Sequence, residues 1–177
     1  MISLNIVFWL FVIVFAAIGA MRGWAKELLV AFSVILALFI IAVLDTYIQP
    51  MQPFLNGNNS TSFWTQSIIV IVLAFFGYQT PNMPRVGGGK FAKDKLQDAL
   101  FGAVLGAFNG YLIIGSLWFF LDQAKYFPDF ISAPIPGTPA GDAAIRLLSA
   151  LPPVWLTIPT VYFAIAVSFL FVVVVFI

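Results

Sequence analysis

A repeat of small residues within one apolar stretch constrains this chain more than any other feature of its sequence. Small residues recur every four positions between residues 98 and 121, in two parallel rows: Gly102, Gly106 and Gly110, and Ala99, Ala103 and Ala107. On an α-helix, residues four apart drift by only about 40° per step, so each row follows one slowly winding stripe. A helix face with so few side chain atoms is typical of membrane proteins, where it packs closely against another helix.

The composition places the chain among membrane proteins with several spans. Hydrophobic residues make up 62% of 177 positions, charged residues only 8%, and the mean hydropathy is +1.06, which is far outside the range of soluble domains. The net charge of +1 gives no field that would attract nucleic acid. The chain has neither Cys nor His, which excludes disulfides, the usual zinc sites, axial histidine ligation and Cys or Ser–His nucleophiles. We therefore expect no metal, no cofactor and no catalytic residue.

The apolar stretches predict an all-α fold, a polytopic transmembrane bundle of four to five spans. Residues 3–21, 28–48 and 98–121 are long enough to cross a hydrocarbon core of about 30 Å. The stretch 63–78 is short, and the stretch 154–177 carries a proline near its start.

A short helix is expected between the last two spans. Asp142 is a possible N-cap for a segment through Leu151, whose apolar face suits the membrane interface. The predicted organisation is a four-helix membrane domain over residues 1–122, a Pro-rich loop with this interfacial helix over 123–153, and an additional C-terminal span over 154–177.

The distribution of charge predicts the topology. Six of the eight basic residues fall in the first and third connections between spans, and four of the seven acidic residues fall in the second and fourth. Because connections rich in Lys and Arg remain in the cytoplasm, the first and third connections are predicted to be cytoplasmic, with the N-terminus outside.

The first connection carries a compact charged group: Arg22, Lys26 and Glu27. The two basic residues share one helix face and could contact a partner protein or anionic lipid headgroups. Alternatively they are topology anchors, with Glu27 paired to a loop lysine.

Two polar residues of the glycine-bearing helix have competing interpretations. Asp98 is expected in the first turn of that helix, where a carboxylate gains about 0.3 to 1 kcal/mol from the helix dipole. The alternative is an ion pair from Asp98 to Arg22 or Lys26 that joins the two hairpins. Asn109 is expected to form an interhelical hydrogen bond, worth about 0.6 kcal/mol on average. Since no charged residue is expected at mid-membrane, the sequence counts against an autonomous pump.

Two signatures together resemble the CvpA family, the colicin V production proteins of bacterial inner membranes. The first is Arg22-Gly23-x-x-Lys26-Glu27, and the second is Asp98 followed at four-residue steps by Gly102, Gly106 and Gly110. The resemblance covers about residues 3–122 and implies an inner-membrane protein of about four spans, linked to colicin V production, a form of toxin biosynthesis, and to envelope homeostasis. The chain departs from the family pattern at Asn109, where Arg is frequent, at Asn5, where an acidic residue is common, and in its fifth span.

The first hypothesis is a non-enzymatic inner-membrane protein of this family, embedded in the lipid bilayer. Its partners would be other membrane protein subunits or further copies of the chain. A second hypothesis is an accessory structural subunit of a larger energy-transducing or photosynthetic complex, with residues 154–177 as a docking helix. A small channel or transporter is a third, for which only Asn109 and scattered Ser and Thr could line a pathway.

Overall fold

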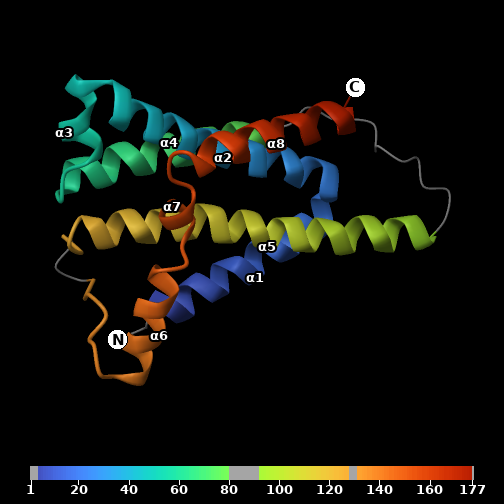
Figure 1. Cartoon of the computed structure of the whole chain (residues 1–177). Helices are drawn as coiled ribbons and strands as arrows, with labels where there is room; N and C mark the ends of the chain where they lie inside the picture. The colour runs from blue at the N-terminus through green and yellow to red at the C-terminus, as the bar shows by residue number, and fades with distance from the viewer. Residues whose placement is uncertain (1–3, 80–91, 128–130, 177) are drawn as a thin grey trace.

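The chain folds into a bundle of helices around one long central helix. The computed structural model describes residues 4–79, 92–127 and 131–176, and every regular element within these ranges is helical. Four of these helices are long and apolar enough to cross a membrane: α1 (Leu4–Arg22), α2 (Trp24–Tyr47), α4 (Ser60–Tyr78) and α5 (Ala92–Gln123). This confirms the predicted all-helical fold with four candidate spans. In Figure 1, α5 lies between α1 on one side and α2, α4 and α8 on the other.

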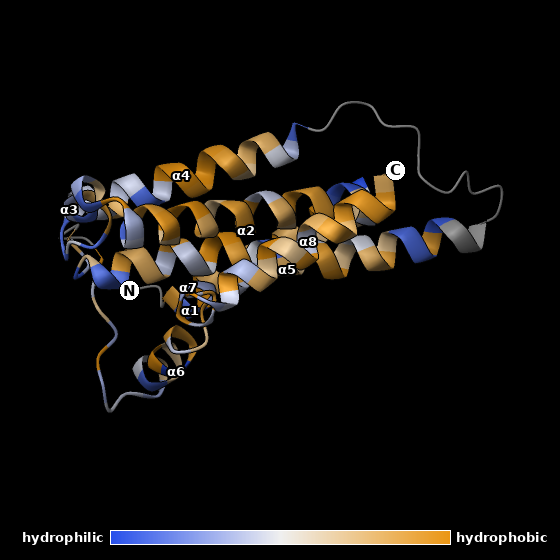
Figure 2. Cartoon of the chain, turned by 45° about the horizontal axis from the view of Figure 1, so that its top comes forward, coloured by the Kyte–Doolittle hydropathy of each residue, from blue (hydrophilic) through white to orange (hydrophobic). Residues whose placement is uncertain are grey.

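The helices are apolar along their length and polar at their ends, as Figure 2 shows. Hydrophilic residues gather near the short helix α3 and at the beginning of α5. This distribution matches a bundle whose middle lies in hydrocarbon and whose two ends reach water.

Helices α1 and α2 form a hairpin joined by a single residue. Gly23 separates Arg22 from Trp24 and has a φ of +87°, a conformation that L side chains rarely adopt and that favours glycine. The second span therefore begins at Trp24 rather than at residue 28, and it includes most of the predicted connection.

Helix α4 is longer than its apolar stretch indicated. It begins at Ser60, because the side chain of Asn59 accepts a hydrogen bond from the Ser62 backbone N–H at 2.9 Å and caps the helix. The resulting 19 residues are about 28 Å long, close to the thickness of a hydrocarbon core. The 3-10 helix η1 (Gln49–Met51) and helix α3 (Gln52–Leu55) connect α2 to α4.

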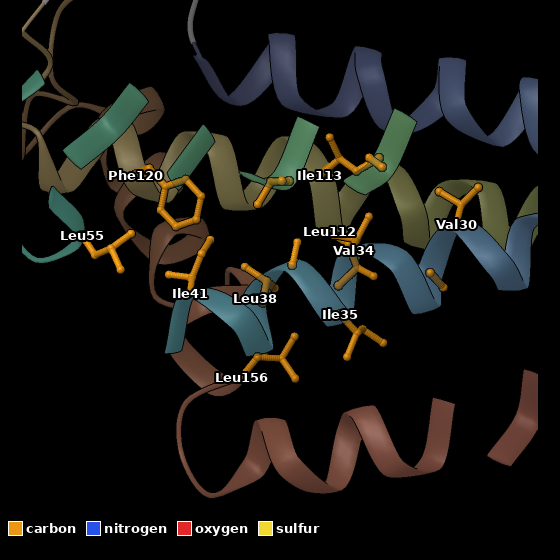
Figure 3. Packing of buried hydrophobic residues seen from close by; sticks show 14 residues of the cluster. Val30, Val34, Ile35, Leu38, Ile41, Leu55, Leu112, Ile113, Phe120 and Leu156 are labelled. Atoms are coloured by element: carbon orange, nitrogen blue, oxygen red, sulfur yellow. The ribbon is translucent and has the colours of Figure 1, made fainter. Parts of the chain in front are cut away.

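The core lies mainly between α2 and α5. One face of α2 is buried at three- and four-residue steps, and it meets buried side chains of α5, as Figure 3 shows. The labelled members from these two helices are Val30, Val34, Ile35, Leu38, Ile41, Leu112, Ile113 and Phe120. Because lipid is as apolar as these side chains, the stabilisation comes from close packing rather than from removal of water.

The C-terminal part differs from the sequence prediction in two respects. Helix α6 (Pro139–Leu148) is capped by Thr138, whose side chain accepts from the Gly141 N–H at 3.0 Å. Asp142 lies in its first turn and accepts from the Gly137 N–H at 2.9 Å, so the prediction of Asp142 as the N-cap was wrong.

The predicted fifth span is broken into two helices. Helix α7 (Pro152–Trp155) ends before Pro159, and helix α8 (Thr160–Phe176) has only 17 residues, fewer than any of the four candidate spans. Proline has no N–H to donate within a helix, so an uninterrupted helix through residue 159 is disfavoured. Helix α8 packs along α2, where the hydroxyl groups of Tyr162 and Tyr47 are 3.1 Å apart.

Candidate functional site

The glycine row of α5 lies against the backbone of α1. A methyl group added at Gly102 would be 2.3 Å from the carbonyl oxygen of Gly19, and one added at Gly106 would be 2.3 Å from the carbonyl oxygen of Phe15. A methyl group added at Gly19 would in turn be 2.1 Å from the Gly102 oxygen. These distances leave no space for a side chain at any of the three glycines.

The remaining small residues of α5 have more varied surroundings. At Gly110 a methyl group would be 2.8 Å from the Phe15 Cβ, so this glycine also faces α1. Ala99 and Ala103 are half-buried beside the glycine row. Gly115 faces a different element, since its added methyl group would be 2.8 Å from Pro152 of α7.

Asp98 stabilises the beginning of a helix other than its own. Its Oδ1 atom accepts a hydrogen bond at 3.2 Å from the backbone N–H of Trp24, the first residue of α2. A methyl group at Gly23 would be 2.8 Å from both Asp98 carboxylate oxygens, so this position requires glycine for space as well as for its φ angle. The carboxylate also lies at the positive end of the α2 dipole.

The prediction that Asp98 lies in the first turn of its own helix was therefore wrong. Helix α5 begins at Ala92, and Asp98 lies beyond its first turn. Its carboxylate caps α2 across the hairpin junction, a contact that joins residues 74 positions apart.

Glu27 is fully buried and is bonded from two sides. It forms an ion pair with Arg22, and its Oε2 atom accepts a hydrogen bond at 2.8 Å from the Asn109 side chain nitrogen. The same nitrogen donates to the Glu27 backbone oxygen at 2.9 Å. Glu27 therefore pairs with Arg22 rather than with Lys95, the loop lysine whose side chain the structure describes. Lys90 and Lys93 lie outside the described side chains.

Arg22 connects this pair to a further helix. Its second guanidinium nitrogen donates to the backbone oxygen of Tyr78 at 3.2 Å, and its guanidinium carbon lies 4.4 Å from the centre of the Tyr78 ring. Tyr78 is the last residue of α4, where the free carbonyl groups carry negative partial charge. We call Arg22, Glu27, Asp98 and Asn109 the polar cluster; with Trp24 and Tyr78 it connects α1, α2, α4 and α5.

Lys26 lies next to the polar cluster but has no bond to it among the described contacts. Its side chain is half-buried on α2, and the ion pair found within the described ranges is the one between Arg22 and Glu27. A contact of Lys26 with a partner or with lipid stays a prediction.

Sequence reasoning missed three participants in this site. Gly19 carried a usable signal, since it is a small residue near the end of the first span and could have been matched to the glycine row. Tyr78 contributes chiefly a backbone oxygen, and Trp24 a backbone N–H, which are groups that every such residue has and that no sequence pattern distinguishes.

The fold and the polar cluster define a multi-pass helical membrane protein held together at one end by buried polar contacts. Residues 4–132 match the family model of the colicin V production protein, and the chain belongs to this family. No curated protein and no solved structure matches the chain. The match includes all four candidate spans and ends before α6, α7 and α8.

Proposed function

We propose that this chain is a non-enzymatic protein of the bacterial inner membrane that acts in colicin V production and envelope homeostasis. In this proposal the two signatures have one shared role, which is to hold the α1–α2 hairpin against α5. The observation that carries the proposal is the burial of Glu27 between Arg22 and Asn109.

The bonding within the polar cluster supports a structural role. A buried carboxylate is costly unless it is paired and hydrogen-bonded, and Glu27 has both a guanidinium and an amide partner. Asp98 is likewise engaged by the Trp24 N–H. Charged groups with partners inside the chain stabilise a particular helix arrangement, whereas a catalytic group has to face its substrate.

We also propose the orientation in which the polar cluster lies at the cytoplasmic side. Arg22 and Lys26 of the first connection and Lys95 of the third lie at this end of the bundle, which supports the assignment. Lys26 and exposed Lys95 would then contact cytoplasmic partners or anionic lipid headgroups.

Cysteine labelling tests the orientation, because the chain has no cysteine of its own. Asn58 and Lys95 are exposed at opposite ends of the bundle. In intact spheroplasts, a membrane-impermeant maleimide should label the Asn58→Cys variant at once and the Lys95→Cys variant only after permeabilisation. The reverse order would refute the orientation.

Complementation tests the function. The chain is expressed in a bacterial strain that makes colicin V and lacks its own member of this family. The wild-type chain should restore the zone of growth inhibition on a sensitive lawn, and Asn109→Leu should lower both the zone and the folded protein in the membrane. Val104→Leu, at an exposed position of the same helix, is the matched control. Wild-type chain that inserts normally but restores no colicin would refute the proposed role.

A further inference from the structure

A cavity of about 220 Å³ lies at the end of the bundle opposite the polar cluster. Residues from α2, α4, α5 and the segment around α7 line it. Its apolar walls include Leu38, Phe120 and Leu156, which are buried. The cavity is open to the surroundings, because part of its lining is exposed: Thr46, Asn56, Gln123 and Thr157.

Asp45 is the charged residue that lines this cavity. Its Oδ1 atom is buried and has no hydrogen-bond partner among the described residues. Its backbone oxygen accepts from the Gln52 side chain at 3.0 Å, which fixes the end of α2 without using the carboxylate. A buried carboxylate oxygen without a partner is unfavourable unless a ligand supplies a donor or a positive charge.

The surroundings of Asp45 increase the preference for a cation. Asp45 lies in the last turn of α2, where the carbonyl groups carry negative partial charge. No Lys or Arg lines the cavity. Gln66 is buried there and donates its amide nitrogen to the Leu55 backbone oxygen, so its side chain oxygen remains as an acceptor.

We propose that this cavity binds a primary ammonium group, with Asp45 as the counter-charge and the amide oxygens of Gln66 and Gln123 as further acceptors. A primary ammonium brings three N–H donors and one positive charge, which matches one carboxylate among neutral acceptors. The apolar walls accommodate the carbon atoms attached to it. A metal ion fits less well, since no group of three or more His, Cys, Asp or Glu that could hold one occurs in the described ranges.

The same chemistry is present in a free amine and in an ethanolamine lipid headgroup. The experiment therefore uses the full chain in nanodiscs of phosphatidylcholine and phosphatidylglycerol, which lack primary ammonium groups. One arm titrates soluble ethanolamine and follows binding by saturation-transfer NMR. The other arm adds phosphatidylethanolamine to the nanodiscs and measures by native mass spectrometry which lipid remains bound after mild delipidation.

Three variants separate the site from general effects. Asp45→Asn keeps the shape but removes the charge, and it should weaken binding about tenfold or more, as expected for loss of a charged hydrogen bond. Ala42→Leu fills the cavity from α2 and leaves the carboxylate in place, so it should abolish binding. This variant tests the site independently if Asp45→Asn does not fold. Asp122→Asn changes a carboxylate at the same end that does not line the cavity, and it should bind as the wild type does.

Binding in either arm that depends on Asp45 and Ala42 supports the proposal, and the arm that responds identifies the source of the ammonium. Retention of phosphatidylethanolamine without binding of ethanolamine indicates a lipid site. Binding of ethanolamine without lipid selectivity indicates a soluble ligand. The proposal is overturned if neither probe binds, or if either cavity variant folds and binds as tightly as the wild type.

Discussion

Replacement of Gly106 by leucine is the most direct perturbation of the contact between α1 and α5. The structure leaves a methyl group at this position only 2.3 Å from the Phe15 carbonyl oxygen and 2.9 Å from the Gly19 Cα. Ordinary contacts of a Cβ atom begin near 3.4 Å, so the two helices would have to separate locally by about 1 Å. Both close atoms belong to the backbone, which cannot rotate out of the way.

The expected loss of stability follows from two opposing effects. Overpacking of a close contact costs about 1 to 3 kcal/mol and occasionally more, and leucine adds four carbons where one does not fit. The intrinsic helix preference of leucine over glycine offsets up to about 1 kcal/mol of this. We expect the Gly106→Leu variant to be less stable by about 2 kcal/mol, with Gly106→Ala between it and the wild type.

Equilibrium unfolding by SDS in mixed micelles, followed by circular dichroism, measures this difference. Val104→Leu is the matched control, because Val104 lies two residues away on the same helix with 66% of its surface exposed. This variant should remain within about 0.5 kcal/mol of the wild type. Equal stability of the Gly106→Leu and Val104→Leu variants would refute the close approach of α1 and α5.

The same unfolding assay checks further predictions for the polar cluster. Arg22→Ala removes the counter-charge of buried Glu27 and should cost about 3 to 5 kcal/mol. Adding Asn109→Arg to this variant should recover part of the loss, because it supplies a guanidinium from α5. A double variant no more stable than Arg22→Ala alone would contradict that reasoning. Asp98→Ala should cost about 1 kcal/mol through loss of the α2 cap, whereas Asp98→Asn should cost only a few tenths; equal losses would exclude capping. Gly23→Ala should cost at least about 1 to 2 kcal/mol, because its φ of +87° is unfavourable for alanine; an unchanged midpoint would show that the junction is relaxed.

The membrane-spanning helices were predictable from the sequence because their signal is local. A run of apolar residues of sufficient length specifies a span without reference to its neighbours. The exact beginnings were less predictable, since they depend on capping groups. Helix α4 begins at Ser60 because of adjacent Asn59, but α2 begins at Trp24 next to Asp98, which is 74 residues away in the chain.

The polar cluster was only partly predictable for a related reason. The sequence identified all four residues, but not which of them would meet. The position of Glu27 beside Arg22 and Lys26 suggested an exposed connection, whereas the one-residue junction at Gly23 draws Glu27 into the bundle. The sequence indicated that the glycine row needs a close neighbour, and only the fold shows that Gly19 of α1 faces it.

The division of the fifth apolar stretch shows the limit of hydropathy alone. Residues 154–177 contain no charged residue and are mostly apolar, yet α7 and α8 are separate and α8 has 17 residues. The signal was present in Pro159, which interrupts helical hydrogen bonding. The position of the turn between the two helices depends on tertiary contacts, and the packing of Pro152 against Gly115 is one of them.

The coupling between Glu27 and Asn109 tests most directly whether the α1–α2 hairpin and α5, the segments that carry the two family signatures, form one structural unit. A double-mutant cycle compares Glu27→Leu, Asn109→Leu and the double variant by SDS unfolding. Glu27→Leu and Asn109→Leu each remove one side of the hydrogen bond between the two side chains. The lost counter-charge of Arg22 is common to Glu27→Leu and the double variant, so it cancels in the cycle. The structure predicts a coupling free energy of about 1 to 2 kcal/mol for the bond between the two side chains, at the upper end of values for interhelical hydrogen bonds in membranes. If the two single losses add to within about 0.3 kcal/mol, Glu27 of α2 and Asn109 of α5 act independently, which would contradict the proposed structural unit.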